Sequence, residues 1–169
     1  MTDDKRIDEL HELIEDIEVA MLTTRRPDGR LVSRPMMTQK REAVADLWYV
    51  TDIESHKMDE LESDPHVNLA FYDQHSREWV SVSGLARLSR DRDRIRELYD
   101  SSWKAWFEKV DDVRDGGPDD PRIALILVEA DSVTYLKQDK SMPAVLFELA
   151  KGRITGERPD VGEVRRMSM

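Results

Sequence analysis

The chain has 169 residues and a net charge of −10, from 36 acidic and 26 basic side chains. This length predicts one domain that can bury a sizeable core. The acidic excess argues against a nucleic-acid partner, because the chain would repel a phosphate backbone. There is no cysteine, which excludes disulfides, thiol catalysis and thiolate metal sites.

The sequence also gives expectations about location and metals. No apolar run approaches the roughly 18 residues of a membrane span, and the N-terminal MTDDKRIDEL is too charged for a signal peptide. A cytoplasmic protein is therefore expected. The four histidines fall in different elements and none pairs with another at i, i+4, so no metal site is expected.

Hydrophobic periodicity predicts a mainly β fold with flanking helices. Helices are expected at 3–18, 55–62, 91–107 and from 141 to about 152. Strands are expected at 19–24, 30–39, 44–51, 66–72, 78–88 and 123–135. Six strands with a few helices predict a small antiparallel barrel. The domain should span 1–152, followed by a charged, extended tail at 153–169.

One glycine and one connecting segment give further information about the fold. Gly84 in the middle of the fifth strand predicts a bulge or a close backbone approach. Residues 108–121 contain too much Asp, Gly and Pro for regular structure. The acidic pairs in this loop are expected to be solvated charges rather than a cation site.

Cationic and hydroxyl residues cluster near the ends of the second and third strands. Arg34, Thr51, Ser55 and Lys57 are placed so that they converge on one phosphate, close to the start of a helix. A helix N-terminus favours an anion, and Arg and Lys add charge-assisted hydrogen bonds. The alternative is that these are ordinary surface charges and that Ser55 is only a helix cap.

Several separated motifs together resemble one known family. They are Ser33-Arg34-Pro35-Met36, Tyr49-Val50-Thr51 through Ser55-His56-Lys57, Trp103-Lys104-Ala105-Trp106-Phe107 with Gly117-Pro118-Asp119-Asp120-Pro121, and residues 155–163. In this order they resemble the general stress protein 26 branch of the pyridoxamine 5'-phosphate oxidase-like superfamily, whose members are FMN-binding split barrels. The resemblance covers nearly the whole chain and implies a six-stranded antiparallel split β-barrel.

The resemblance also implies site residues. Arg34, Ser55 and Lys57 would hold the FMN phosphate, with Thr51 near the ribityl chain; the cofactor-binding segments that contain them also include Pro35, Val50 and His56. Met36, Met37 and Thr38 would lie along the isoalloxazine ring and meet its polar edge largely through backbone groups. Methionine suits such an apolar wall because it is flexible and polarizable. The alternative for Met36 and Met37 is plain barrel core.

Trp103, Lys104 and Trp106 allow two interpretations. As in the dimers of the superfamily, they would close over the flavin from a second subunit; alternatively, the two tryptophans anchor their own helix. We expect Trp106 to be the anchor and Trp103 to lie nearer the flavin.

The family pattern is not matched everywhere. His56 stands where pyridoxamine-phosphate oxidases usually carry Arg, and Gln39 stands near a position where they are basic. These departures argue against pyridoxamine-phosphate oxidation itself. No catalytic acid or base stands out, and the catalytic residues stay unknown.

The resulting hypothesis is a homodimeric FMN-dependent oxidoreductase that acts on an unknown small substrate, with its site at the subunit interface. The alternatives are a non-catalytic flavin-binding stress protein, which sequesters or senses the cofactor, and a deazaflavin- or haem-binding relative.

Overall fold

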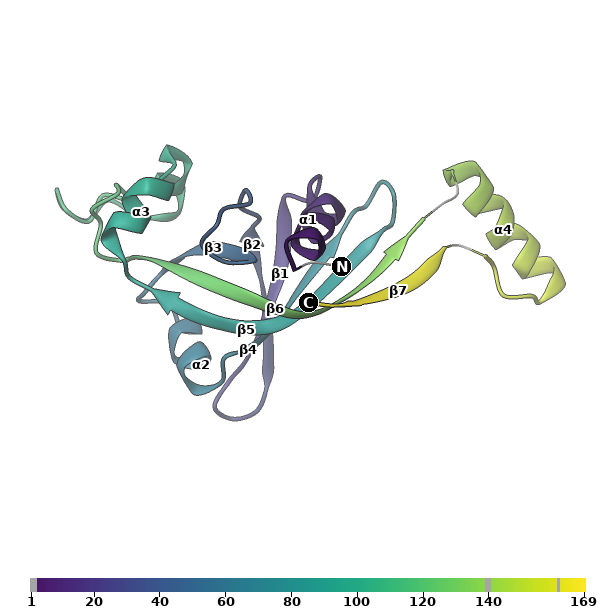
Figure 1. Cartoon of the computed structure of the whole chain (residues 1–169), viewed down its shortest axis with the longest axis horizontal. Helices are drawn as coiled ribbons and strands as arrows, with labels where there is room; N and C mark the ends of the chain where they lie inside the picture. Colours follow the sequence, from purple (N-terminus) through teal and green to yellow (C-terminus); the bar gives the residue numbers. More distant parts are fainter. Residues whose placement is uncertain (1–2, 139–140, 161) are drawn as a thin grey trace.

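The computed structural model describes residues 3–138, 141–160 and 162–169. Its strands form one antiparallel sheet in the order β2-β1-β4-β5-β6-β3, and β7 pairs with β6 beside this path (Figure 1). The strands are β1 (Val19–Arg25), β2 (Leu31–Met37), β3 (Leu47–Asp52), β4 (His66–Tyr72), β5 (Trp79–Ser89), β6 (Ile123–Lys137) and β7 (Glu163–Ser168). The sheet does not close on itself, which is consistent with a split barrel, and the mainly β class is confirmed.

The strand count was wrong by one. β7 lies within the residues expected to form an extended tail, and it pairs with the distal part of β6, where Val164 lies opposite Leu136. Because β6 is fifteen residues long, it runs past the end of β3 and exposes an edge that β7 completes.

The helices are α1 (Asp3–Ile14), α2 (Lys57–Ser63), α3 (Arg92–Leu98), the 3-10 helix η1 (Ser101–Trp106) and α4 (Met142–Thr155). The single helix predicted at 91–107 is wrong, because the chain leaves helical geometry at Tyr99 and Asp100. The Asp100 side chain then accepts a hydrogen bond from the Ser102 amide at 2.8 Å, which caps η1 as a separate helix.

Two apolar cores share β6. Ile126 and Val128 face the main core, together with Leu10 and Ile14 of α1. The alternate residues Leu125 and Leu127 face a second core that contains Trp48, Ile95, Trp103 and Phe107. The prediction that 123–128 is buried on both faces is therefore confirmed.

Gly84 allows β5 to cross close to β6. A Cβ at this position would lie 2.2 Å from the Glu129 carbonyl oxygen, and the pairing register shifts between Ser83 and Gly84. The predicted bulge and close approach are both confirmed.

The 108–121 loop has no regular structure, as predicted, but a buried ion pair holds it. Asp120 is fully buried and accepts hydrogen bonds from Arg122 Nη2 at 2.7 Å and from the Gly116 amide at 2.8 Å. Burial alone would raise the pKa of Asp120, but these hydrogen bonds lower it. The expectation of a solvated charge is wrong at this residue.

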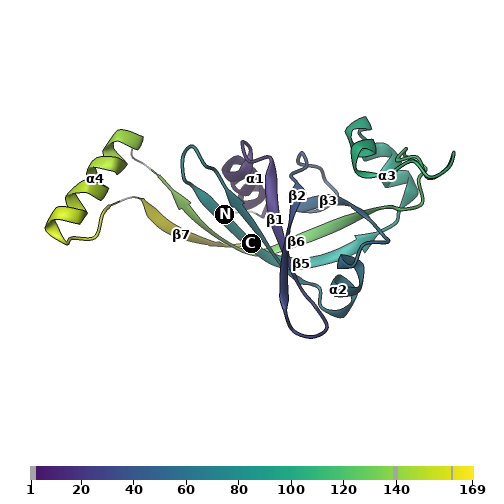
Figure 2. The same cartoon turned by 180° about the vertical axis from the view of Figure 1, so that it is seen from behind.

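The molecule is elongated. Figures 1 and 2 show α3 at one end and α4 at the other, with α4 carried away from the sheet on the far ends of β6 and β7. Among the described residues, no helix is long and apolar enough to cross a membrane.

Packing in the second core predicts that substitution of two tryptophans will change stability by very different amounts. Trp103 is 4% exposed and Trp106 is 71% exposed. Trp103→Ala should lower the free energy of unfolding by about 3–5 kcal/mol, because it opens a cavity against Trp48 and Tyr99. Trp106→Ala should change it by less than about 0.5 kcal/mol. Urea unfolding of the two apo variants measures both; equal losses would contradict this packing.

Candidate functional site

The first component of the site is the guanidinium of Arg34, which points into the barrel. On β2 the side chains alternate, so Arg34 lies opposite Leu22 on the core face. Its Nη1 donates to Thr24 Oγ1 at 2.7 Å and its Nη2 donates to Glu60 Oε2 at 2.6 Å. Thr24 Oγ1 also donates to Glu60 Oε2, at 2.5 Å. The guanidinium is therefore fixed from β1 and from α2.

Glu60 is the carboxylate that balances this charge. Its side chain is 8% exposed, and that of Arg34 is 21% exposed. Burial alone would raise the pKa of Glu60, but the hydrogen bonds from Thr24 and Arg34 outweigh burial and lower it. Glu60 is thus ionised at neutral pH.

Lys57 and Ser55 supply the other side of the site. Lys57 Nζ donates to Ser55 Oγ at 3.0 Å. Burial, followed by repulsion from the Arg34 charge, lowers the pKa of Lys57, although Asp52 and Glu60 oppose this shift. The structure therefore brings together Arg34, Ser55 and Lys57, the three residues expected at the phosphate.

The neighbouring candidates take different positions. Thr51 is buried, and its hydroxyl donates to the Asp52 carbonyl over a long 3.4 Å. Val50 packs against the second core. His56 is exposed and occupies the cap position of α2 without a side-chain cap bond. The helix expected from Ser55 starts at Lys57 and has seven residues, so side chains supply most of the positive character here.

Strand alternation separates the residues expected along the ring, Met36, Met37 and Thr38, and it also decides where Pro35 lies. Met36 belongs to the main core, whereas Pro35 and Met37 are exposed on the opposite face of the sheet. The Thr38 amide donates to the Glu18 carbonyl at 2.8 Å, so this backbone donor is already used. The Thr38 hydroxyl oxygen is buried and has no partner within the described structure. Met37 and Thr38 line a hollow of about 680 Å³ beside α1.

The aromatic cluster on η1 is arranged opposite to our expectation. Trp103 meets Trp48 and Tyr99 edge to face, with ring centroids 6.2 and 5.4 Å apart, so it is the anchor. Trp106 and Lys104 are exposed at the α3 end of the molecule. The assignment of Trp106 as the anchor is wrong, because the break after α3 changes the phase of the helix.

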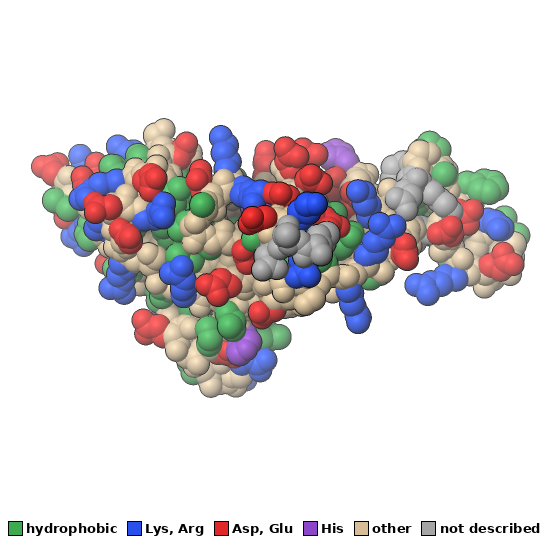
Figure 3. All heavy atoms as spheres, in the orientation of Figure 1, with side chains coloured by type: hydrophobic (Ala, Val, Ile, Leu, Met, Phe, Trp, Pro, Cys, Tyr) green, Lys and Arg blue, Asp and Glu red, His purple; other side chains and the backbone are tan. Residues whose placement is uncertain are grey.

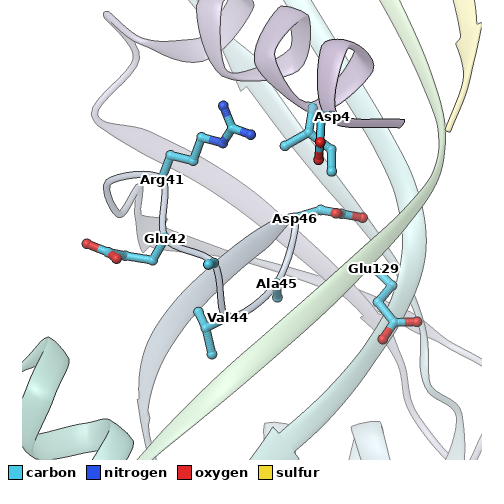
Figure 4. Close-up of a pocket in the computed structure, with 9 residues that line it drawn as sticks. Asp4, Arg41, Glu42, Val44, Ala45, Asp46 and Glu129 are labelled. Atoms are coloured by element: carbon cyan, nitrogen blue, oxygen red, sulfur yellow. The ribbon is translucent and has the colours of Figure 1, made fainter. Parts of the chain in front are cut away.

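A second hollow of about 750 Å³ lies between the start of α1, the 41–46 connection and β6 (Figure 4). Its charges hold this junction together: Arg41 pairs with Asp8, and the Asp46 carboxylate accepts from the Ala130 amide at 2.8 Å. It shares no lining residue with the Arg34 site. Among the described residues, no cluster of His, Asp and Glu could hold a metal ion.

Sequence reasoning missed Thr24 and Glu60. The available signal was the alternation of β1 and β2, which places Thr24 and Arg34 on the core face. A charge at such a position requires a buried partner, and Glu60 follows Lys57 by one helical turn.

The buried pair predicts a stability effect with a defined pH dependence. Glu60→Gln should lower the free energy of unfolding by about 3 kcal/mol at pH 7, because Arg34 loses its counter-charge. The native pKa of Glu60 is lowered, so its contribution is complete above the unfolded value of about 4.3 and is lost as pH falls further. Urea unfolding should show the free energies of unfolding of the wild type and the variant converging as pH falls below that value. A difference that is constant with pH would contradict the ion pair.

Comparison with known proteins identifies the family of this chain. The family described as "Pyridoxamine 5'-phosphate oxidase like" matches residues 5–160. The protein bli-3 of Neurospora crassa is 37% identical over 168 residues, which are 98% of this chain and 80% of that protein.

Two solved structures show the same fold. General stress protein 26 from Bacillus anthracis str. Sterne is 25% identical with a TM-score of 0.62, covering 77% of this chain and 92% of that one. A pyridoxamine 5'-phosphate oxidase-related, FMN binding protein from Nostoc punctiforme PCC 73102 is 15% identical with a TM-score of 0.63, covering 100% and 98%. The resemblance inferred from the motifs is confirmed: the chain belongs to the pyridoxamine 5'-phosphate oxidase-like family.

Proposed function

We propose that the protein binds FMN and acts as a flavin-dependent oxidoreductase on a small substrate. The observation that carries this proposal is the meeting of Arg34 and Lys57 with the Ser55 hydroxyl at one place. Two cations and a hydroxyl suit a terminal phosphate, which offers several acceptor oxygens and about two negative charges.

The electrostatics of the site favour the binding of an anion. Glu60 neutralises one positive charge and fixes the direction of Arg34, but Lys57 still experiences repulsion from Arg34. Arg34 has five N–H donors, and only two groups within the described structure receive them here. A phosphate beside Lys57 would relieve the repulsion and favour the charged ammonium.

Bound FMN would supply the electron- or hydride-transfer chemistry. The residues of this chain would then position it: Arg34, Ser55 and Lys57 at the phosphate, Thr51 near the ribityl chain, and Met37 with Thr38 beside the ring. His56 and Gln39 depart from the oxidase pattern, so the proposed substrate is not pyridoxamine phosphate.

The test is the absorption spectrum of the purified protein, followed by addition of NAD(P)H. A flavin band that bleaches supports an FMN-dependent oxidoreductase. A flavin band that no pyridine nucleotide bleaches favours a non-catalytic flavin protein. A haem or deazaflavin spectrum contradicts the proposal.

Phosphate contacts should dominate flavin affinity. Losing one charge-assisted hydrogen bond costs roughly 1.5–3 kcal/mol, so Arg34→Ala combined with Lys57→Ala should remove most of the preference for FMN over riboflavin. Titration of both flavins into each apo protein measures this preference. Arg30→Ala is the matched control, because Arg30 is exposed and pairs only with Asp28 within the described structure. A double variant that still strongly prefers FMN would refute the assignment.

The lowered pKa of Lys57 predicts a pH dependence. The charged form binds phosphate, so the preference for FMN should fall as pH rises, beginning below the value of about 10.4 that is usual for lysine. Lys57→Arg should abolish this fall because arginine stays protonated. The ratio of FMN to riboflavin affinity between pH 7 and 10 measures the effect. Identical profiles for wild type and variant would show that Lys57 does not contact the phosphate.

A further inference from the structure

The lysine of the anion site differs from an ordinary surface lysine. Basic and acidic side chains are mixed over the surface that Figure 3 shows, and an exposed lysine such as Lys109 pairs with a carboxylate there, that of Asp112. Lys57 instead donates to the uncharged Ser55 hydroxyl at 3.0 Å, and it forms no ion pair within the described residues. Its amine is therefore not held by a counter-charge.

The geometry of α2 places the Arg34 guanidinium beside this amine. Lys57 and Glu60 are three residues apart, so their side chains share one face of the helix. Glu60 Oε2 accepts from Arg34 Nη2 at 2.6 Å, and the guanidinium therefore lies against the same face. Within the described structure, Arg34 directs donors to Thr24 and Glu60 only, so its other N–H groups can hold an anion next to Lys57.

The surroundings favour the neutral form of the Lys57 amine. Burial, followed by repulsion from Arg34, lowers the pKa of Lys57, and the carboxylates of Asp52 and Glu60 act in the opposite direction. Only the neutral amine is a nucleophile, because the ammonium has no free electron pair. The side chain is also partly exposed, so a small reagent can reach it.

An acyl phosphate combines the two groups that this arrangement suits. Its phosphate is an anion for Arg34 and Ser55, and its electrophilic acyl carbon is joined to that phosphate through a single bridging oxygen. We propose that Lys57 is a site of acylation by acyl phosphates, with the anion site holding the phosphate. This inference rests on the phosphate site of the proposed function and adds a covalent modification to it.

The reaction is a transfer of the acyl group from oxygen to nitrogen. The electron pair of the neutral Lys57 amine forms a C–N bond with the acyl carbon, and the C–O bond to the phosphate breaks. The electron pair of that bond leaves with the phosphate, which also takes up the proton that the nitrogen loses. The products are an amide on Lys57 and inorganic phosphate, and nothing is oxidised or reduced. Arg34 stabilises the negative charge that develops on the leaving phosphate.

Acylation and flavin binding exclude each other at this site. The amide has no positive charge, so an acylated Lys57 loses its charge-assisted hydrogen bond to a phosphate. Conversely, a bound FMN phosphate occupies the place that an acyl phosphate needs, and it protects the amine. The acyl phosphate concentration therefore regulates how much of the protein can take up flavin.

The test compares two lysines in the full-length apo protein. Acetyl phosphate is added, and peptide mass spectrometry measures the acetylation rates of Lys57 and Lys104. Lys104 is the matched control, because it is exposed on η1 and has no ion pair within the described structure. Lys57 should react about tenfold faster or more, because the bound reagent is held beside its amine. Inorganic phosphate should slow the reaction at Lys57 and leave that at Lys104 unchanged.

A second reagent separates binding of the phosphate from simple reactivity of the amine. The N-hydroxysuccinimide ester of acetic acid carries no phosphate, so the ratio of the Lys57 rate to the Lys104 rate should be lower with this ester. Inorganic phosphate should not change that ratio. Equal ratios for the two reagents, or a Lys57 rate with acetyl phosphate that inorganic phosphate does not lower, would overturn the proposal. These measurements use the wild type and do not depend on the folding of a variant.

Flavin titration measures the consequence for the cofactor. After treatment with acetyl phosphate, the wild type should lose its preference for FMN over riboflavin, whereas Lys57→Arg should keep it, because a guanidinium stays protonated and is not acylated. An equal loss in both proteins would contradict regulation through Lys57. Failure of the flavin proposal is distinguishable: an untreated protein that binds no FMN rejects that proposal, while protection of Lys57 by inorganic phosphate still decides the acylation.

Discussion

The charge of Arg34, held on the core side of the sheet, is the constraint on which the site depends. A buried guanidinium is costly unless a carboxylate and hydrogen bonds compensate it. Glu60 and Thr24 provide these, and both partners come from other elements. The ion pair therefore fixes α2 against β1 and β2, with Met58 and Leu61 of the same helix buried in the main core. Because α2 begins at Lys57, the same contact that stabilises the fold also places the second cation.

β6 organises the apolar part of the structure, as the Arg34 ion pair organises the site. Its first six residues are buried, and alternate side chains enter the two cores. The second core carries Trp103 and Phe107, and Arg122 lies 5.5 Å from the centre of the Phe107 ring just before β6 begins. Asp120 holds Arg122, so the irregular 108–121 loop is fixed by one buried ion pair at its end. The exposed Lys104 and Trp106 are thus displayed on a well-supported segment.

Local sequence patterns were sufficient to predict much of the fold. They failed where contacts with residues distant in the sequence determine the structure. The 66–72 strand and the Gly84 bulge follow from side-chain alternation and from the absence of a Cβ. The strand β7 does not, because its charged sequence has no strand pattern and depends on the free edge of β6. The roles expected for Trp103 and Trp106 were reversed for a similar reason. One capped turn at Asp100 restarts the helix, so Trp103 and Phe107 face the core. For the site, sequence identified both cations but not Glu60, since an acidic residue on a short helix normally faces solvent.

Strand alternation on β2 separates the proposed anion site from the outer surface of the sheet. Arg34 and Met36 point toward the core, whereas Pro35 and Met37 point to the opposite face. The pairing of β1 with β2 therefore determines both the anion site and the outer surface. A shift of one residue in this register would move Arg34 outward and place Pro35 in the core. Such a shift would leave Glu60 buried without its counter-charge and would replace Pro35 with a charged arginine on the outer face of the sheet. The cost on both faces specifies the register more strongly than either feature would alone.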